Sequence, residues 1–355
     1  MFSLVLASPF HGMTLLLAVA SLAQFLGVSA VYDNVELFVD EINAKQDSWL
    51  ASVHRPPFTS EPYGKLQSAY IAAKTPDENG ELSVKNLVLP PEFDARKKFK
   101  ACARIIGHVR YAMKDQANCG SCAAMAAVGS FNDRLCIKRN FQEPLSAAYV
   151  VSCCTPETGC PPPYGCDGGN TAEVWDFAQR YGIPTGGGYP EGPVRDSNGC
   201  WPYFLPKCAH VPGMSKKYPQ CPQEAQAPAC QLFCPNTKYK RSLAMDRHYV
   251  AAPGAIIMSN SIEGIKAEVY TNGSVTAGFE LYQDFIYYKS GVYKYVRGKY
   301  LAVHAVKLIG WGKAAIGDYW LAVNSWNEDW GEGGLFRIAM GQCRIEDLVV
   351  YGNPQ

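Results

Sequence analysis

The sequence lacks an excess of charge of either sign. Its 355 residues include 33 Lys and Arg against 32 Asp and Glu, a formal net charge of +1. Nucleic acids and anionic membranes attract proteins through an excess of positive charge, so the net charge indicates neither partner. Charged residues make up only 18% of the chain and hydrophobic residues 48%. This composition excludes a disordered or fibrous protein, because there is ample apolar surface to bury.

Long apolar runs are also scarce. Residues 14–27 form an apolar run that is shorter than the ~20 residues needed to span a bilayer, and Val28-Ser29-Ala30 then resembles a cleavage site. We interpret residues 1–30 as a secretory signal peptide, although residues 1–12 contain no Lys or Arg. An N-terminal membrane anchor is the alternative. We expect no membrane association in the mature form, and localisation to the lysosomal or endosomal lumen or secretion.

Cysteine is absent before Cys102, and all 14 cysteines lie between Cys102 and Cys343. This density indicates an oxidising compartment. The cysteine-free residues 31–88 have a mixed, loosely patterned composition, and we interpret them as a separable segment that ends before Leu89. Because the chain is longer than one hydrophobic core usually allows, two lobes plus this removable segment are expected.

The hydrophobic patterning places helices first and strands last. Residues 170–181 predict a helix, with Asn170 as its cap and Gly182 as its stop. Residues 303–311, 319–324 and 334–339 are rich in β-branched and aromatic residues and predict strands of one sheet or barrel. No fixed-period repeat is present. The fold class expected is α+β with two lobes.

The chemical signal lies at residues 116–122, which precede an Ala-rich run expected to be helical up to about Cys136. Cys122 would stand at the helix N-terminus, where unpaired N–H groups favour the nucleophilic thiolate. A nucleophile needs a base and the base an orienting group. His304 is the one histidine within a strand pattern, and Asn324, at the end of the next strand, could orient it.

Other interpretations of these residues remain open. Cys119 and Cys122 could form a thioredoxin-like redox pair, and His304 could be a core histidine. We expect no metal site, because no Cys/His quartet has regular metal-ligand spacing. No cofactor is expected either.

Together these motifs resemble the papain family of cysteine proteases and, within it, the cathepsin B group. The shared motifs are Gln116 with Cys119-Gly120-Ser121-Cys122, His304 with Gly310-Trp311-Gly312, and Asn324-Ser325-Trp326. The resemblance implies a papain-like two-lobed fold with a helical left lobe, a β-barrel-like right lobe and an active-site cleft between them. It also implies a propeptide at residues 31–88, a mature peptidase at residues 89–355 and an occluding-loop region at residues 200–234.

The resemblance implies roles for four residues in peptide hydrolysis. Cys122 would be the nucleophile and His304 the general base and acid. Asn324 would orient the imidazole. Gln116 would donate, together with the Cys122 backbone N–H, to the oxyanion of the tetrahedral intermediate, a type of donor whose removal costs ~10²–10³ in rate.

It also implies five residues that contact substrate or shape the cleft. Gly168 and Gly169 would pair with the substrate backbone, which must approach the main chain closely. Trp326 would cover the Asn324–His304 hydrogen bond. Leu348 would line the subsite for the second residue before the scissile bond, and His210 would anchor the occluding loop, with Asp115 as its partner. The partners implied are peptide and protein substrates, the chain's own propeptide and cystatin-like inhibitors.

The resemblance, and not the spacing, implies the disulfide pairing and leaves Cys343 free beside Cys122. The pairs are Cys102–Cys136, Cys119–Cys166, Cys153–Cys230, Cys154–Cys160, Cys200–Cys234 and Cys208–Cys221.

Several residues depart from the family pattern. Ala123 replaces a Trp, Ala302-Val303 replaces Gly-Gly, and Arg344 replaces a Gly. Val211 stands where the family has the histidine that binds a substrate's C-terminal carboxylate, so dipeptidyl carboxypeptidase activity should be weak and endopeptidase activity should dominate. With Leu348, the second substrate residue before the scissile bond should be apolar. The second functional hypothesis is a protease-like protein that binds peptides or inhibitors with little turnover.

Overall fold

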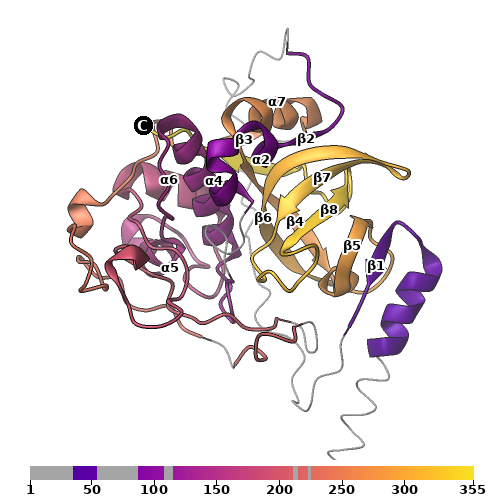
Figure 1. Ribbon diagram of the computed structural model, residues 1–355, viewed down its shortest axis with the longest axis horizontal. Helices are drawn as coiled ribbons and strands as arrows, with labels where there is room; N and C mark the ends of the chain where they lie inside the picture. Colours follow the sequence, from indigo (N-terminus) through magenta and orange to yellow (C-terminus); the bar gives the residue numbers. More distant parts are fainter. Residues whose placement is uncertain (1–34, 54–86, 108–114, 211–214, 223–224, 259) are drawn as a thin grey trace, which may run out of the picture.

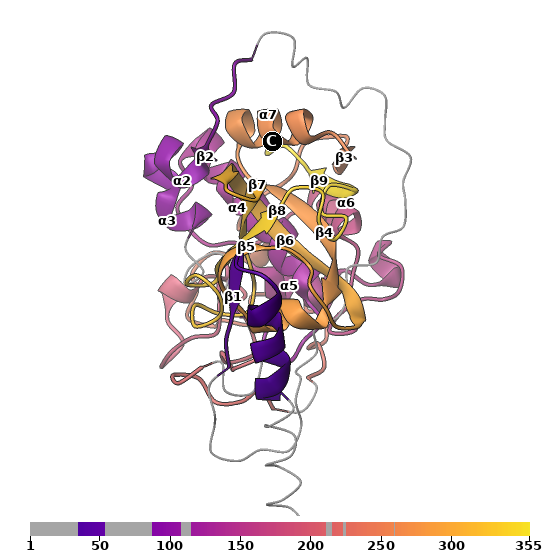
Figure 2. The same cartoon turned by 90° about the vertical axis from the view of Figure 1, so that its right-hand side faces the viewer.

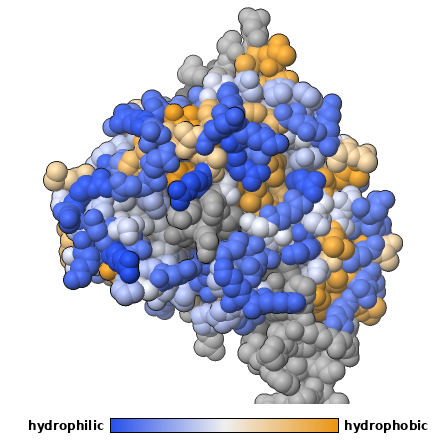
Figure 3. All heavy atoms as spheres, viewed as in Figure 1, coloured by the Kyte–Doolittle hydropathy of each residue, from blue (hydrophilic) through white to orange (hydrophobic). Residues whose placement is uncertain are grey.

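The computed structural model describes residues 35–53, 87–107, 115–210, 215–222, 225–258 and 260–355. The predicted signal peptide and much of the predicted propeptide lie outside these residues. The chain forms a helical lobe and a sheet lobe that lie side by side (Figure 1). Polar side chains cover most of the face shown in Figure 3. Among the described residues, no helix is both long and apolar enough to cross a membrane.

The helical lobe is built around one long, almost entirely buried helix. Its three main helices are α4 (Cys122–Arg139), α5 (Ala147–Cys153) and α6 (Thr171–Tyr181). The predicted helix at residues 170–181 is confirmed: the Asn170 side chain accepts a hydrogen bond from the Ala172 N–H at 2.9 Å, and Gly182 ends the helix. The small side chains of α4 explain its central position, because Ala residues let neighbours approach it from all sides.

Other helices flank the two lobes. They are α2 (Ala95–Lys98), α3 (Ala103–Ile106) and α7 (Ile262–Asn272), together with the 3-10 turns η2 (Lys100–Cys102), η3 (Pro156–Thr158), η4 (Asp196–Asn198), η5 (Leu243–Met245) and η6 (Gln283–Tyr287). In the view of Figure 2, α7 lies across the upper end of the sheet.

The sheet lobe contains the predicted C-terminal strands. Its strands are β1 (Trp49–Ala51), β2 (Phe93–Asp94), β3 (Ile256–Met258), β4 (Val275–Tyr282), β5 (Tyr288–Tyr293), β6 (Tyr300–Ala314), β7 (Gly317–Val323), β8 (Leu335–Ala339) and β9 (Leu348–Tyr351). The strand order is β1-β5-β8-β7-β6-β4-β9-β3, and β2 pairs with β6. The predicted α+β class is confirmed, and the sheet is open and not a closed barrel, since β1 and β3 stand at its two ends.

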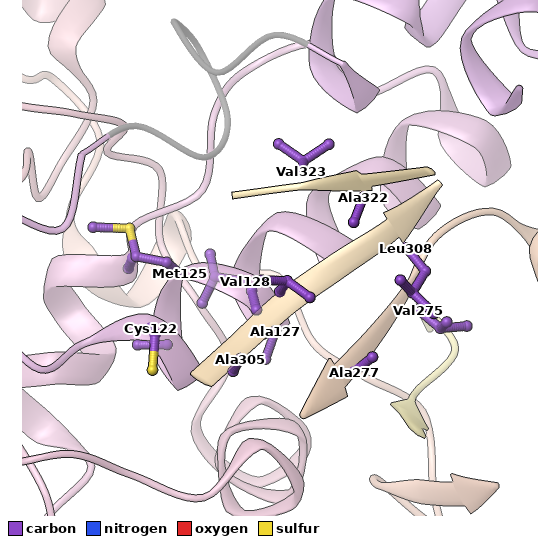
Figure 4. Packing of buried hydrophobic residues seen from close by; sticks show 14 of the residues in the cluster. Cys122, Met125, Ala127, Val128, Val275, Ala277, Ala305, Leu308, Ala322 and Val323 are labelled. Atoms are coloured by element: carbon purple, nitrogen blue, oxygen red, sulfur yellow. The ribbon is translucent and has the colours of Figure 1, made fainter. Parts of the chain in front are cut away.

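The two lobes meet where α4 packs against β6. Ala127 and Val128 of α4 lie beside Ala305 of β6, and Cys122 stands at the near end of the helix (Figure 4). These side chains are buried and belong to one continuous hydrophobic core. The contact therefore sets the position of the N-terminus of α4 relative to the strand that carries His304.

The described part of the N-terminal segment docks on the edge of the sheet. Residues 35–45 are helical, and β1 follows them and pairs antiparallel with β5 (Figure 2). Trp49 stacks on Tyr288, with ring centroids 6.2 Å apart, and its indole N–H donates to the Lys294 carbonyl at 3.0 Å. This segment is an integral strand of the sheet in this form of the protein.

Candidate active site

Cys122 is the first residue of α4 and is fully buried. Ser121 precedes it as the N-cap residue, and the Met125 N–H closes the first turn on the Ser121 carbonyl at 2.9 Å. The structure therefore places Cys122 at the N-terminus of α4, where the first-turn N–H groups stabilise a negative charge.

His304 lies on β6 and reaches the residue that follows β7. Its Nε2–H donates to Asn324 Oδ1 at 2.8 Å, and the Ser325 N–H, also at 2.8 Å, donates to the same oxygen. Trp326 stacks on the imidazole, with ring centroids 4.9 Å apart. His304 Nδ1 is buried and makes no hydrogen bond within the described part of the chain. The hydrogen bond to Asn324 fixes the tautomer that leaves Nδ1 able to accept a proton.

The pKa of His304 is lowered to about 4: burial is the main cause, the hydrogen bond to Asn324 opposes it, and the nearby His210 adds to the lowering. The charged imidazolium is disfavoured because the ring is removed from water. In this form of the protein the ring is therefore neutral near neutral pH.

Gln116 is fully buried and held from four directions. Its side-chain oxygen accepts from Ser325 Oγ at 2.6 Å, and its Nε2 donates to the Cys119 carbonyl at 3.0 Å. Its backbone N–H donates to the Ser325 carbonyl at 2.9 Å, and its carbonyl accepts from the Tyr203 hydroxyl at 2.9 Å. The amide is thereby oriented with its N–H₂ group on the side of the loop that precedes Cys122.

Gly168 and Gly169 are tied to the same loop. The Cys119–Cys166 disulfide and a 2.8 Å hydrogen bond from the Gly120 N–H to the Cys166 carbonyl join the two segments. Gly168 has φ +132°, a conformation that disfavours any side chain. This backbone edge therefore lies next to the start of α4.

Ala123 faces this edge. A Cβ atom built on Gly169 would lie 3.6 Å from the Ala123 Cβ. A shallow pocket, open in part to solvent, lies here, and Ala123, Gly168, Gly169 and Glu173 are among its lining residues. The small side chain at position 123 leaves this space empty.

Leu348 begins β9 and is buried opposite Gly278 of β4. Glu346 is engaged elsewhere: it accepts from the Trp320 indole N–H at 2.7 Å and from the Gly341 N–H at 2.9 Å. Asp347 pairs with Arg344 at 2.6 Å on the surface. Glu346 and Asp347 are thus both engaged by polar partners, and Leu348 is a buried apolar side chain beside them.

Two residues that depart from the family pattern, Arg344 and Val303, lie in different surroundings. Arg344 has φ +59°, a left-handed conformation that suits the glycine of the family, but its guanidinium points to solvent and pairs with Asp347. Val303 is half-buried opposite Glu280 of β4. The larger side chain of Arg344 is therefore accommodated on the surface by its ion pair with Asp347.

The region 200–234 is anchored at two places. His210 Nε2 contacts Asp115 Oδ1, and the other Asp115 oxygen accepts from the Cys208 N–H at 2.8 Å. Glu328 accepts from Lys217 at 2.8 Å and from Lys207 at 3.0 Å, and from the Tyr218 hydroxyl. We call this second group, Lys207, Lys217, Tyr218 and Glu328, the Glu328 clasp.

Six disulfides are present, and their pairs are those that the family resemblance implies. Among the described residues, Cys122 and Cys343 are the cysteines that form no disulfide. Within the described residues, Cys208, His210 and Cys221 are the one group with metal-ligating side chains close together. Because the two sulfurs are joined in a disulfide, they cannot act as thiolate ligands, and we assign the group to the anchoring of the loop.

Sequence reasoning missed three residues around the site: Tyr203, Glu328 and Lys307. Tyr203 contacts the loop before Cys122, Glu328 forms the clasp, and Lys307 pairs with Asp133 of α4. No short motif marks any of them. A Lys inside the apolar run of a predicted strand was the one available signal, since a buried cation needs a partner.

A model of the papain family of cysteine proteases matches residues 89–353 of the chain. The chain belongs to the papain family. It is 35% identical over 349 residues to cathepsin B-like cysteine proteinase 4 of Caenorhabditis elegans, across 96% of this chain and 98% of that protein. It is 39% identical over 272 residues to a cathepsin B-like cysteine proteinase of Schistosoma japonicum, across 75% and 74% of the two chains. This family member is therefore cathepsin B-like.

Solved structures agree with this assignment. Procathepsin B S9 from Trypanosoma congolense superposes with a TM-score of 0.69 and 28% identity, across 90% of this chain and 98% of that chain. Digestive procathepsin L 3 of Tenebrio molitor, at 20% identity and a TM-score of 0.54, shares the fold across 91% and 89% of the two chains. The family member has the fold of a papain-like zymogen.

Proposed function

We propose that this papain-family, cathepsin B-like protease is a cysteine endopeptidase in which Cys122 is the nucleophile, His304 the general base and acid, Asn324 the orienter and Gln116 an oxyanion donor. One observation carries the proposal: the imidazole of His304 is held by Asn324 at 2.8 Å on the strand that packs against the helix beginning at Cys122. The arrangement provides a nucleophile, a base and an orienting group on rigid elements.

In this mechanism the Cys122 thiol transfers its proton to His304 Nδ1, and the thiolate attacks the carbonyl carbon of the peptide. The oxyanion accepts from the Cys122 N–H and from Gln116 Nε2, which turns from the Cys119 carbonyl toward it. His304 then protonates the leaving amine, and water, deprotonated by His304, releases the acid from the thioester and restores the thiol. Ser325 supports the amide by holding its oxygen at 2.6 Å.

We propose that residues 1–30 are a signal peptide and residues 31–88 an inhibitory propeptide, removed by cleavage at or near Leu89, with residues 89–355 as the mature enzyme and residues 200–234 as its occluding-loop region. The pairing of β1 with β5 and the start of the family match at residue 89 support this division. A lysosomal or endosomal lumen, or secretion, follows from the leader and the six disulfides.

The proposed specificity follows from Leu348 and from the loop. Phe or Leu should be preferred to Arg as the second residue before the scissile bond, because a buried guanidinium opposite Leu348 would be unpaired. A library that varies this position measures the preference, and equal rates for Arg would contradict the role of Leu348.

Preference for a free substrate C-terminus should be weak, since Val211 has no donor. Lys217 could replace the missing histidine, but its ammonium is held by Glu328 at 2.8 Å. Comparing dipeptide release from a peptide acid and from its C-terminal amide tests this. A strong preference for the acid would contradict the proposal.

The decisive experiment is titration of the processed chain with a thiolate-directed epoxide, alongside peptide turnover, with Cys122→Ala as the control. Stoichiometric labelling with matching turnover is the result expected of a protease. The second candidate, a peptide- or inhibitor-binding protein, draws support from the buried, neutral His304, and labelling with negligible turnover would favour it. Absence of labelling after removal of residues 31–88 would contradict both.

A further inference from the structure

Tyr203 joins the region 200–234 to the loop that precedes Cys122. It lies between Cys200 and Cys208, and its side chain is 2% exposed. Its hydroxyl donates to the Gln116 carbonyl at 2.9 Å and lies 2.8 Å from Ser121 Oγ. Because the tyrosine proton is committed to Gln116, Ser121 Oγ–H donates to the tyrosine oxygen.

The contact between Ser121 and Tyr203 has a consequence for the helix of Cys122. A serine at the N-cap position ordinarily accepts a hydrogen bond from an N–H of the first turn. In the described first turn of α4, the Ser121 side chain accepts none. Its hydroxyl is instead turned to Tyr203, so it does not compete for the N–H groups that stabilise charge beside Cys122.

We propose that Tyr203 is a positioning residue: it holds the Ser121 hydroxyl away from the first turn of α4 and fixes the main chain of Gln116, so that the thiolate and the oxyanion keep their N–H donors. The inference rests on the proposed function of Cys122 and Gln116. Burial raises the pKa of the Tyr203 phenol well above its ordinary value, which keeps the hydroxyl protonated in acidic and neutral solution.

The test uses the full chain, processed under mildly acidic conditions, with Tyr203→Phe, Ser121→Ala and the double variant. Without the phenol oxygen, the Ser121 hydroxyl turns to cap α4. In Tyr203→Phe, the thiol pKa, read from the pH dependence of epoxide labelling, should rise by about one pH unit, and kcat should fall about tenfold with KM little changed. The double variant should regain the lower thiol pKa, because no hydroxyl remains to cap the helix.

Tyr239→Phe is the matched control. The Tyr239 hydroxyl accepts from Thr185 Oγ1 at 2.9 Å and donates to Asp246 at 2.5 Å in the same lobe, without contacting the loop before Cys122. This variant should leave the thiol pKa unchanged.

Two outcomes would overturn the inference about Tyr203. The first is a thiol pKa that does not shift in Tyr203→Phe. The second is an equal shift of the thiol pKa in Tyr203→Phe and in the double variant, which would show that the Tyr203 hydroxyl has a merely structural role. If Tyr203→Phe does not fold, Ser121→Ala decides, because a raised thiol pKa there would show that the serine helps the thiolate. If the unaltered chain is not labelled at all, the proposed function itself fails.

Discussion

Lys307 and Asp133 form a fully buried ion pair that joins the strand of His304 to the helix of Cys122, with Lys307 Nζ 2.9 and 3.0 Å from the two carboxylate oxygens. Burial raises the pKa of Asp133 and lowers that of Lys307, and each charge offsets the cost of the other. Ser274 Oγ donates to the same carboxylate at 2.5 Å. The pair connects the two lobes inside the core.

We predict that Asp133→Asn lowers the free energy of unfolding by about 3–5 kcal/mol, because it leaves a buried cation unpaired. The double variant Asp133→Leu with Lys307→Met should lose much less, since no charge remains in the core. Urea unfolding of the full chain measures both. Glu332→Gln, which removes the acid of a half-exposed pair with Arg337, is the control and should cost less than 1 kcal/mol or so. A similar small loss in Asp133→Asn would contradict the prediction.

The pKa of His304 predicts a loss of stability in acid. The ring has its ordinary pKa of 6.5 when unfolded and a pKa of about 4 when buried, so the unfolded chain binds the proton first. The free energy of unfolding should therefore be unaffected by this group above the ordinary pKa and fall by about 3 kcal/mol as the pH drops to the folded pKa.

The measurement compares unfolding of the full chain carrying Cys122→Ala with the same chain carrying His304→Gln in addition. The second chain should show the weaker dependence on pH. Identical pH profiles would mean that other groups cause the acid sensitivity. The direction agrees with processing under mildly acidic conditions, since protonation favours conformations that expose the ring.

The Glu328 clasp should restrain the occluding-loop region even in mild acid. Burial opposes ionisation of Glu328, but the hydrogen bonds from Lys217, Tyr218 and Lys207 outweigh it and lower its pKa to about 2. Because the pKa of Glu328 is depressed in the folded chain, its ionised form stabilises the folded loop at any pH above the ordinary carboxyl pKa. This stabilisation is lost only as the pH falls toward 2.

Glu328→Gln should therefore loosen the loop. We expect the affinity for a cystatin-like inhibitor and the kcat/KM for a protein substrate to rise about two- to fivefold at mildly acidic pH. This fold-change corresponds to the free energy that a partly exposed ion pair usually contributes. Glu191→Gln is the matched control, because the Glu191 carboxylate is 68% exposed and lies 3.9 Å from the same Lys207. Equal effects of the two variants would assign the change to net charge alone.

Ala123 offers a way to fill the pocket at the start of α4. Ala123→Trp should raise the free energy of unfolding by about 1–2 kcal/mol, the usual gain from filling a cavity. Ala126 lies on the same helix, is fully buried and does not line the pocket. The variant Ala126→Trp should therefore be destabilised by overpacking. Thermal unfolding of the two variants separates these cases, and destabilisation by both would show that the pocket cannot admit an indole.

The residues that the sequence predicted well carry local signals. Asn170 and Gly182 bracket α6 because a cap and a stop act on neighbouring residues. The candidate nucleophile Cys122, the candidate base His304 and Asn324 each belong to a short motif in or beside a regular element, and the structure brings His304 and Asn324 into a 2.8 Å hydrogen bond.

Such local signals could not predict the contacts between segments that are distant in the sequence. Tyr203 and Gln116 are 87 residues apart, and Tyr218 and Glu328 are 110 apart. Neither pattern nor propensity encodes which loop folds over which strand, because these contacts form only after the lobes have packed. The open edge of the sheet could not be predicted for the same reason. Strand order depends on which strands pair at long range, and the composition of each strand is also compatible with a closed barrel.

The pairing of β1 with β5 gives the proposed cleavage near Leu89 a consequence for the boundary of the sheet. Removal of residues 31–88 would leave the backbone of β5 as an unprotected rim of N–H and C=O groups, the kind of surface on which chains associate. The register already shifts between Leu50 and Ala51, and Lys289 stands at that irregularity on β5. A short, bulged rim with a positive charge is a poor template for a foreign strand. In a chain trimmed as proposed, the irregularity that β1 now accommodates would therefore disfavour pairing of β5 with a second copy.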